Sequence, residues 1–351
     1  MPRTIRRVGL ITAVAVVALV ALVVARRVST VIPDTLLNAP TRIVTRWIPP
    51  TPPATLNTVT DAERETWREL GERLVGQLVW SSNREGNHEL YLVDLETGGE
   101  QRLTTHPHVD FFSRFSPDGQ QISFLRSQRE WVSFRDEEAW DLYVMNVDGT
   151  GERLLVNGAY HPTWLPDGSG LVYVYLNEVF QFDLATNART LIYAATEGRV
   201  FEPELSEDGR LAVTWRYIPQ ESVGVIDLRS GRYLPLSTER SCQVTWFPGR
   251  QQAVWIDPGG IGGTQVMTGT FTGDDSRTET LIDLPGSYSH EYFPKVSADG
   301  EWLVWGASAE GHEHDRADYE LFIWKIGSPA DSAIRWTYSP ANDQWPDLFV
   351  P

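Results

Sequence analysis

A turn containing glycine, usually Asp-Gly, recurs along this chain at intervals of 40 to 51 residues. Each turn separates two short apolar segments, and further segments of strand-like composition fill the interval to the next turn. A repeat of this length that holds about four strands is typical of the blades of a β-propeller. The turn glycines are Gly119, Gly168, Gly209, Gly249 and Gly300.

The first repeat, residues 76–119, shows the unit most clearly. It predicts strands over 78–81 and 89–95, a short strand near 102–104, and a fourth strand that enters Ser116-Pro117-Asp118-Gly119. Asp-Gly suits a tight connection between antiparallel strands because glycine adopts positive φ without strain. Comparable segments follow each later turn, so the sequence predicts six units of about four strands.

The two ends of the repeat region are complementary. Residues 343–350 have the composition of a strand that enters such a turn, and residues 78–81 that of a strand that leaves one. We therefore predict that the C-terminal strand completes the first blade, which leaves no open edge between the first and last blades. The fold class that follows is all-β: a six-bladed β-propeller with four-stranded blades over residues 76–351.

The N-terminus carries an uncharged apolar run of 18 residues, 8–25. As a helix it would be about 27 Å long, close to the thickness of the hydrocarbon core of a bilayer. Arg6 and Arg7 precede the run, which favours a cytoplasmic segment over residues 1–7 and a transmembrane signal anchor over 8–25. A signal peptide cleaved after Ala25 is the alternative, and either interpretation exports the rest of the chain.

Two shorter segments connect this run to the propeller. Residues 26–58 contain six prolines, which predicts an extended linker. Residues 59–75 predict a short amphipathic helix, in which Thr60 and Glu63 form a capping box and Trp67, Leu70 and Leu74 share one face. We expect this helix to pack on the edge of the propeller, although a partner-binding role is the alternative.

The repeat resembles a known family. Residues 115–124 read Phe-Ser-Pro-Asp-Gly-Gln-Gln-Ile-Ser-Phe, and with Glu89-Leu90-Tyr91-Leu92-Val93-Asp94 and Arg102-Leu103-Thr104 they resemble the TolB-type propeller repeat. The resemblance covers residues 76–350, and it is weakest in the fourth unit, where Pro248-Gly249 replaces the motif. It implies a six-bladed propeller that serves as an exported binding or scaffold module. The separate N-terminal domain of TolB has no counterpart here, so the resemblance does not extend to the translocation role of TolB.

Composition and motifs exclude several functions. The net charge of −17 opposes binding to nucleic acid, because phosphate backbones would be repelled. The sequence contains neither the G-x-S-x-G motif of serine hydrolases nor a P-loop. We therefore expect a binding module that needs no cofactor, and an enzyme is the less favoured interpretation.

The strand before each Asp-Gly turn should be the innermost strand of its blade, so the residues where it begins should face the central channel. These residues combine carboxylates with aromatic rings, a mixture that suits a cation, a basic peptide or a sugar. The alternative is that they fill the channel and bond to one another. The predicted channel-mouth residues are Asp110, Phe111, Phe112, Tyr160, His161, Phe201, Glu202, Cys242, Gln243, Glu291, Tyr292, Asn342 and Asp343.

Histidines leave a second function open. His312 and His314 alternate in a loop of the last unit and are candidate metal ligands, although a solvated loop is the simpler interpretation. The alternative function is therefore a metal-dependent polysaccharide lyase or hydrolase that uses the propeller channel. The favoured function is a membrane-anchored, extracytoplasmic propeller that acts as a binding scaffold in the bacterial cell envelope. Its expected partner is an envelope protein or peptide, or a glycan.

Overall fold

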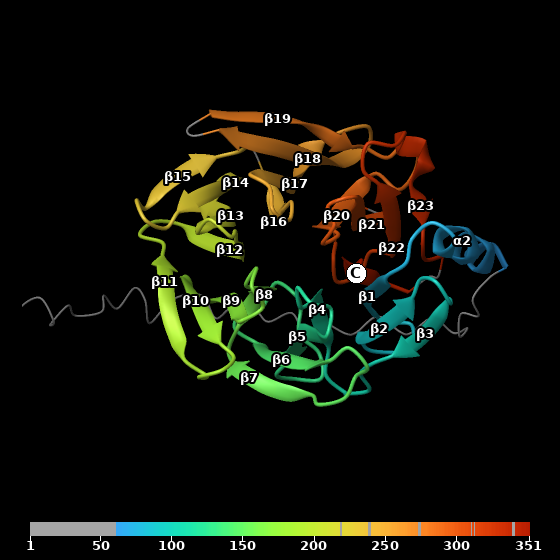
Figure 1. The fold of residues 1–351 in the computed structure, drawn as a ribbon, viewed down its shortest axis with the longest axis horizontal. Helices are drawn as coiled ribbons and strands as arrows, with labels where there is room; N and C mark the ends of the chain where they lie inside the picture. The colour runs from blue at the N-terminus through green and yellow to red at the C-terminus, as the bar shows by residue number, and fades with distance from the viewer. Residues whose placement is uncertain are drawn as a thin grey trace, which may run out of the picture. The chain divides into compact units, whose positions relative to one another are not determined.

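The computed structural model describes residues 61–217, 220–237, 240–272, 275–309, 311, 313–338 and 341–351. In these ranges, 24 strands form six four-stranded antiparallel sheets around a central channel (Figure 1). The predicted all-β, six-bladed propeller with four-stranded blades is therefore confirmed.

The blades are numbered 1 to 6, and each is given from its innermost to its outermost strand. Blades 1 and 2 comprise β24 (Asp343–Phe349), β1 (Gln77–Ser82), β2 (Glu89–Asp94) and β3 (Gly99–Arg102), then β4 (Asp110–Phe115), β5 (Gln121–Ser127), β6 (Trp140–Asn146) and β7 (Arg153–Asn157). Blades 3 and 4 comprise β8 (Tyr160–Trp164), β9 (Gly170–Tyr175), β10 (Glu178–Asp183) and β11 (Arg189–Ala194), then β12 (Arg199–Leu205), β13 (Arg210–Tyr217), β14 (Gln220–Asp227) and β15 (Arg232–Pro235). Blades 5 and 6 comprise β16 (Cys242–Trp246), β17 (Gln252–Gly259), β18 (Gly263–Thr272) and β19 (Asp275–Ile282), then β20 (His290–Val296), β21 (Trp302–Ser308), β22 (Tyr319–Lys325) and β23 (Ile334–Arg335).

The ring closes in blade 1, as the sequence predicts. Strand β24, from the C-terminal end, pairs antiparallel with β1, and the pairing runs from Ser82 opposite Asp343 to Gln77 opposite Phe349. The inner edge of β1 is thereby covered by a strand from the other end of the propeller. The first and last parts of the propeller therefore hold each other in place.

The turns between the inner and second strands have the conformation that their glycines predict. All five turn glycines have positive φ, between 65° and 82°. At Gly119 the space is also restricted, because a Cβ atom would lie 2.5 Å from the ring of Phe349 in β24. A side chain at this position would therefore disturb the strand that closes the ring.

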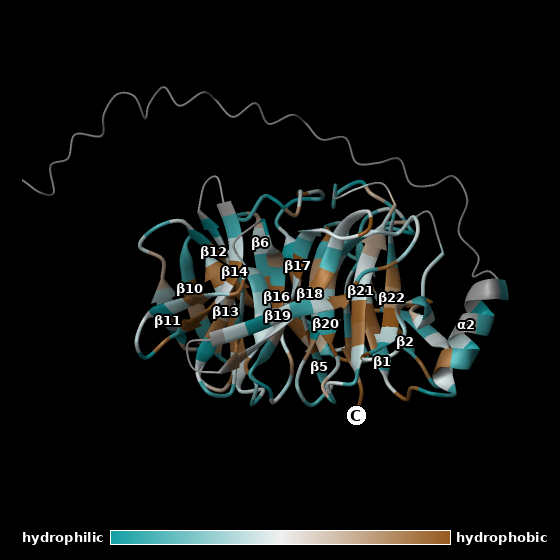
Figure 2. Ribbon diagram, turned by 90° about the horizontal axis from the view of Figure 1, so that it is seen from above, coloured by the Kyte–Doolittle hydropathy of each residue, from teal (hydrophilic) through white to brown (hydrophobic). Residues whose placement is uncertain are grey.

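The core lies between the blades. Each sheet packs against a neighbour on both faces, so the central strands are buried almost throughout, as in β1 and β21. Tryptophans fill much of this space, and Trp80, Trp140, Trp255 and Trp305 are fully buried. Figure 2 shows hydrophobic residues concentrated in the strands and hydrophilic residues in many of the connecting loops. Apolar burial of this extent is the main stabilising term.

Helix α2 (Asp61–Gly71) lies on the perimeter of the propeller. Leu70 and Leu74 are buried, and Trp67 stacks on Trp336 with 5.0 Å between ring centroids. The Trp67 indole N–H also donates a hydrogen bond of 3.0 Å to the Trp336 carbonyl. The apolar face expected from the sequence therefore packs on the propeller edge, whereas the predicted cap residue Thr60 lies outside the described residues.

The predicted membrane anchor, residues 8–25, and the linker, residues 26–58, also lie outside the described residues. In the part of the chain that the structure does describe, no helix combines the length and the apolar character needed to cross a membrane.

Candidate binding site in the central channel

Each inner strand contains one residue whose backbone is in the left-handed region. The φ angles of these six residues lie between 47° and 60°, although none of them is glycine. In most inner strands the pairing register with the second strand shifts at this point, which identifies a β-bulge. A bulge redirects a side chain away from the normal alternation of a strand. The six residues, here called the bulge layer, are Phe112, His161, Glu202, Gln243, Phe293 and Trp345.

The aromatic members of the bulge layer meet in the channel. The ring of Trp345 lies 3.9 Å from that of Phe112 and 4.2 Å from that of Phe293, measured between centroids. The ring of His161 lies 5.0 Å from that of Phe112 and 6.4 Å from that of Trp345. Since these rings come from four blades and are almost fully buried, they fill this level of the channel.

The polar members of the bulge layer link neighbouring blades. His161 Nδ1 accepts a hydrogen bond of 3.2 Å from the backbone N–H of Glu202, and Glu202 accepts one of 2.5 Å from the N–H of Gln243. The Gln243 side chain in turn accepts a bond of 2.5 Å from the N–H of Phe293. A bulge leaves a backbone N–H without its partner in the sheet, and here the preceding blade supplies an acceptor. Burial raises the pKa of Glu202 to about 7 and holds the pKa of His161 well below its usual range, so His161 is neutral.

Three of the four carboxylates predicted at the channel mouth lie inside the protein, and the fourth, Glu202, belongs to the bulge layer. Asp110, Glu291 and Asp343 each precede the bulge residue of their strand by two positions, and all three are 0% exposed. Asp110 accepts two hydrogen bonds of 2.8 Å from Arg126, in the second strand of its blade. Glu291 accepts bonds of 2.9 Å from Thr264 Oγ1 and from the N–H of Leu284.

Asp343 is held in a similar way, since it accepts a bond of 3.2 Å from the Trp80 indole and one of 3.5 Å from Arg84. Burial raises the pKa of all three carboxyl groups, that of Asp110 and Glu291 to about 7. These acids therefore connect the inner strands to the surrounding structure.

Five of the remaining predicted residues directly precede the bulge residue of their strand, whereas Asn342 lies three positions before Trp345 and precedes β24. Their side chains are buried or nearly so, and the pairs Phe111 with Trp140 and Tyr292 with Tyr319 lie 5.6 and 6.0 Å apart between centroids. The sequence thus identified the innermost strand of each blade. A binding role for these residues stays a prediction. The residues concerned are Phe111, Tyr160, Phe201, Cys242, Tyr292 and Asn342.

Of the two candidate metal ligands, the structure describes the position of His314. His314 is buried, and its ring stacks on Tyr319 at 8° and lies 4.5 Å from Tyr292 between centroids. His312 lies outside the described residues. Among the residues with a described position, no three His, Cys, Asp or Glu side chains come together in a way that could hold a metal ion.

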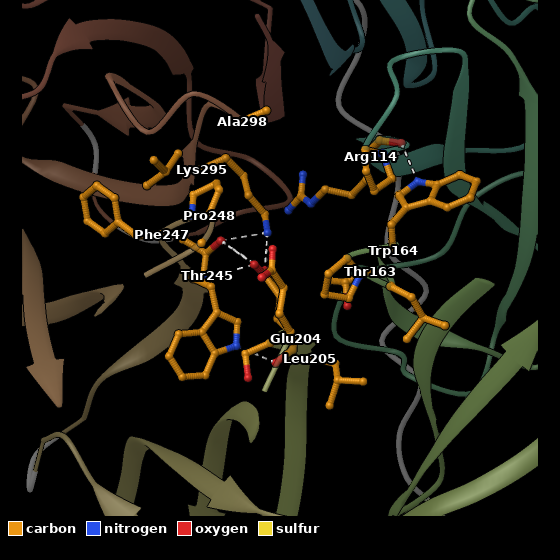
Figure 3. A pocket seen from close by; sticks show the side chains of 18 of the residues that line it. Arg114, Thr163, Trp164, Glu204, Leu205, Thr245, Phe247, Pro248, Lys295 and Ala298 are labelled. Carbon is orange, nitrogen blue, oxygen red and sulfur yellow. Dashed lines mark hydrogen bonds and ion pairs between the residues drawn. The ribbon is translucent and has the colours of Figure 1, made fainter. Parts of the chain in front are cut away.

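A cavity of about 530 Å³ opens at the other end of the inner strands, beside the Asp-Gly turns (Figure 3). All six blades contribute to its wall through the residue that lies two positions after each bulge. These residues form what we call the mouth ring. They are Arg114, Thr163, Glu204, Thr245, Lys295 and Asp347.

Sequence reasoning missed the mouth ring, although the sequence contains a signal for it. Arg114, Thr163, Glu204 and Lys295 each lie five residues before the glycine of their turn, and Thr245 lies four before its own. Counting four or five residues back from each turn glycine selects these residues, whereas the prediction above counted back to the start of each inner strand.

Three of the four charged residues in the mouth ring have described partners: Lys295 and Glu204 form an ion pair, and Asp347 accepts hydrogen bonds from backbone N–H groups. Lys295 Nζ donates to Glu204 at 2.5 Å and to Thr245 Oγ1 at 2.9 Å (Figure 3). The other oxygen of Glu204 accepts a bond of 3.0 Å from the backbone N–H of Trp246. Asp347 accepts one of 2.7 Å from the N–H of Phe115, and burial raises the pKa of Asp347.

Arg114 differs from its neighbours in the ring. Its Nη1 donates to the carbonyl oxygens of Ser113 at 2.8 Å and Pro346 at 3.5 Å. Nε and Nη2 have no acceptor among the described residues, and the guanidinium forms no ion pair with any of them. Burial lowers the pKa of Arg114 more than the nearby Asp347 and Glu204 carboxylates raise it. Figure 3 shows its guanidinium directed into the cavity.

Comparison with known proteins supports the fold. No protein-family model matches the sequence. The YuxL protein of Bacillus subtilis (strain 168), described as an uncharacterized peptidase, is 32% identical over 93 residues, which cover 25% of this chain and 13% of that protein.

Two solved structures resemble the propeller more extensively. TolB from Acinetobacter baumannii matches with a TM-score of 0.57 and 14% identity, over 78% of this chain and 66% of that one. Hydrazine synthase from Kuenenia stuttgartiensis matches with a TM-score of 0.56 and 12% identity, over 80% of this chain and 48% of that one. This chain thus spans at most 66% of each of these proteins. Similarity at this level of identity establishes a TolB-like propeller fold and nothing further.

Proposed function

We propose that this protein is a membrane-anchored, extracytoplasmic binding module of the cell envelope, and that its propeller holds a protein or peptide partner in the cavity beside the Asp-Gly turns. The observation that carries the proposal is the cavity itself. Its volume of about 530 Å³ lies within the range of about 300–1,000 Å³ that is typical of ligand pockets.

The chemistry of the wall suits a peptide. Aromatic and proline side chains, including Trp164, Trp246 and Pro166, offer apolar surface, while Arg114 offers hydrogen-bond donors. Pockets of this kind combine an apolar lining with a few polar groups that set the orientation of the ligand. The aromatic bulge layer fills the channel behind the cavity, so a partner would approach from the side of the Asp-Gly turns.

The location in the envelope is proposed from the sequence. The apolar run over 8–25 is long enough to span a bilayer, and the linker over 26–58 has 33 residues. An extended proline-rich chain of this length would reach roughly 100 Å at about 3.1 Å per residue. A propeller on such a linker could meet partners well away from the membrane surface.

Site-specific photocrosslinking in cells tests the binding site. A photoreactive amino acid is introduced at Pro166, which is exposed on the cavity rim, or at Glu197, which is exposed between β11 and β12. We expect a discrete crosslinked protein from Pro166 and none from Glu197. Equal products from both positions, or a crosslink to polysaccharide alone, would overturn the proposal.

Protease protection tests the location. In intact cells whose outer barrier has been permeabilised, a protease added from outside should cleave the full chain within residues 26–58 and leave an anchored fragment in the membrane. A chain that stays protected until the membrane is dissolved would contradict the proposed topology.

A further inference from the structure

The position of Arg114 in the cavity carries a more specific inference, which rests on the proposed binding function. Arg114 extends from β4 into the cavity, and its Nε and Nη2 have no acceptor among the residues that the structure describes. These two nitrogens form one edge of the guanidinium, and that edge matches the two oxygens of a carboxylate in a bidentate pair. Nη1, in contrast, is fixed by two backbone carbonyls, which sets the orientation of the group.

The surrounding carboxylates do not complete this pair. Glu204 is occupied by Lys295 and by the backbone of Trp246. The oxygens of Asp347 accept backbone N–H groups from Phe115 and Leu348. A partly buried guanidinium without a bound anion is unfavourable, because removal from water opposes its charge. An anion in the cavity would remove that penalty.

The closed inner end of the cavity favours a chain terminus over a passing chain. The bulge layer lies directly behind the mouth ring, and Trp345 lies 3.9 Å from Phe112 and 4.2 Å from Phe293 between centroids. A peptide could therefore enter with its end but could not thread through the channel. The walls near Arg114 include Trp164 and Trp246, which offer apolar surface to the last side chains of such a peptide.

We infer that the cavity binds the C-terminal carboxylate of a peptide partner with apolar last residues, and that Arg114 holds this carboxylate in a bidentate pair. The partner thus presents a free chain end to the face that carries the Asp-Gly turns. A free organic acid has the same recognition group, so the test separates the two sources.

The test is calorimetric titration of the purified full chain in detergent. The probes are the tripeptide acetyl-Ala-Ala-Phe with a free carboxylate, the same peptide as its C-terminal amide, and 3-phenylpropionate. We expect the free-acid tripeptide to bind and its amide to bind roughly 10- to 100-fold more weakly, as loss of a charge-assisted pair would produce. 3-Phenylpropionate should bind more weakly than the free-acid tripeptide.

Two variants assign the effect to Arg114. Arg114→Gln should weaken the free-acid tripeptide by a similar factor of roughly 10 to 100 and should abolish the difference between acid and amide. Arg153→Gln makes the same charge change on the exposed strand β7 and should leave binding unchanged. Thermal unfolding of each variant shows whether it is folded, and the comparison of acid with amide on the natural protein needs no variant.

Equal binding of acid and amide would overturn the inference, as would full binding by Arg114→Gln or no binding of either peptide at millimolar concentration. Binding of 3-phenylpropionate as tightly as the tripeptide would assign the site to a free acid and would also overturn it. The proposed function fails separately. A crosslink from Pro166 that persists in Arg114→Gln would support the proposed binding function but contradict recognition of a C-terminal carboxylate. Tripeptide binding without any crosslink in cells would support carboxylate recognition but contradict the proposed binding function.

Discussion

Glu291→Gln should make this protein more stable at pH 8 than it is with its natural residue. Glu291 is fully buried and accepts hydrogen bonds from Thr264 and from the N–H of Leu284, and no cation among the described residues pairs with it. Burial raises the pKa of its carboxyl group from 4.5 to about 7. At pH 8 the group is therefore ionised in an environment that favours its neutral form.

The magnitude and sign follow from the two pKa values. Between pH 4.5 and about 7 the folded protein binds more protons at this site than the unfolded chain does, so stability falls as the pH rises through that window. The free energy of unfolding falls by about 3 kcal/mol in total once the pH is above 7, and about 1 kcal/mol of this decrease has already occurred at pH 5. Gln resembles the protonated acid, and its amide can keep the contacts to Leu284 and Thr264. The variant should therefore gain about 3 kcal/mol at pH 8 and about 1 kcal/mol at pH 5.

Urea unfolding followed by tryptophan fluorescence measures this difference at the two pH values. Glu96→Gln is a matched control, because it removes the same charge from an exposed residue, and it should change stability by less than about 0.5 kcal/mol at either pH. If Glu291→Gln is less stable than the natural protein at pH 8, or if its gain is the same at pH 5 and pH 8, the argument from burial is wrong.

Three further predictions concern the framework around the channel. Trp345→Ala should lower the free energy of unfolding by about 3–5 kcal/mol, because it leaves a cavity at the centre of the bulge layer. A smaller loss in thermal unfolding would contradict this prediction. Deletion of residues 343–351 should abolish the cooperative unfolding transition, since β1 loses its inner partner; a sharp transition in circular dichroism would contradict this. Trp67→Ala should release α2 while the propeller stays folded, because the stack on Trp336 is lost. Limited proteolysis should then cut near residue 70 first, and uniform protection would show that the contact is dispensable.

The sequence alone was sufficient for the architecture of the propeller. The glycine turns mark the end of five of the six inner strands, and glycine at those positions follows from their positive φ. The apolar segments between the turns gave the number of strands, and the complementary ends at 78–81 and 343–350 gave the closure that the pairing of β1 with β24 confirms. These features depend on local backbone preferences and on short-range patterns, which a sequence displays directly.

The tertiary structure decided what each inner-strand side chain faces. Alternation along a strand predicts two faces, but the bulge at residues such as Phe112 and Trp345 inserts an extra position and redirects the side chain. The sequence prediction therefore placed the carboxylates of Asp110, Glu291 and Asp343 at the mouth of the central channel. In the structure they are buried, and each accepts hydrogen bonds from neighbouring residues.

The membrane anchor and the cell envelope remain predictions from the sequence, since the residues that carry them lie outside the described part of the chain. The cavity, by contrast, required closure of the ring. Arg114 reaches the carbonyl of Pro346, which is 232 residues away along the chain, and six strands each supply one residue to the mouth ring. No local pattern reports such a contact, because it exists only once the last strand has joined the first blade.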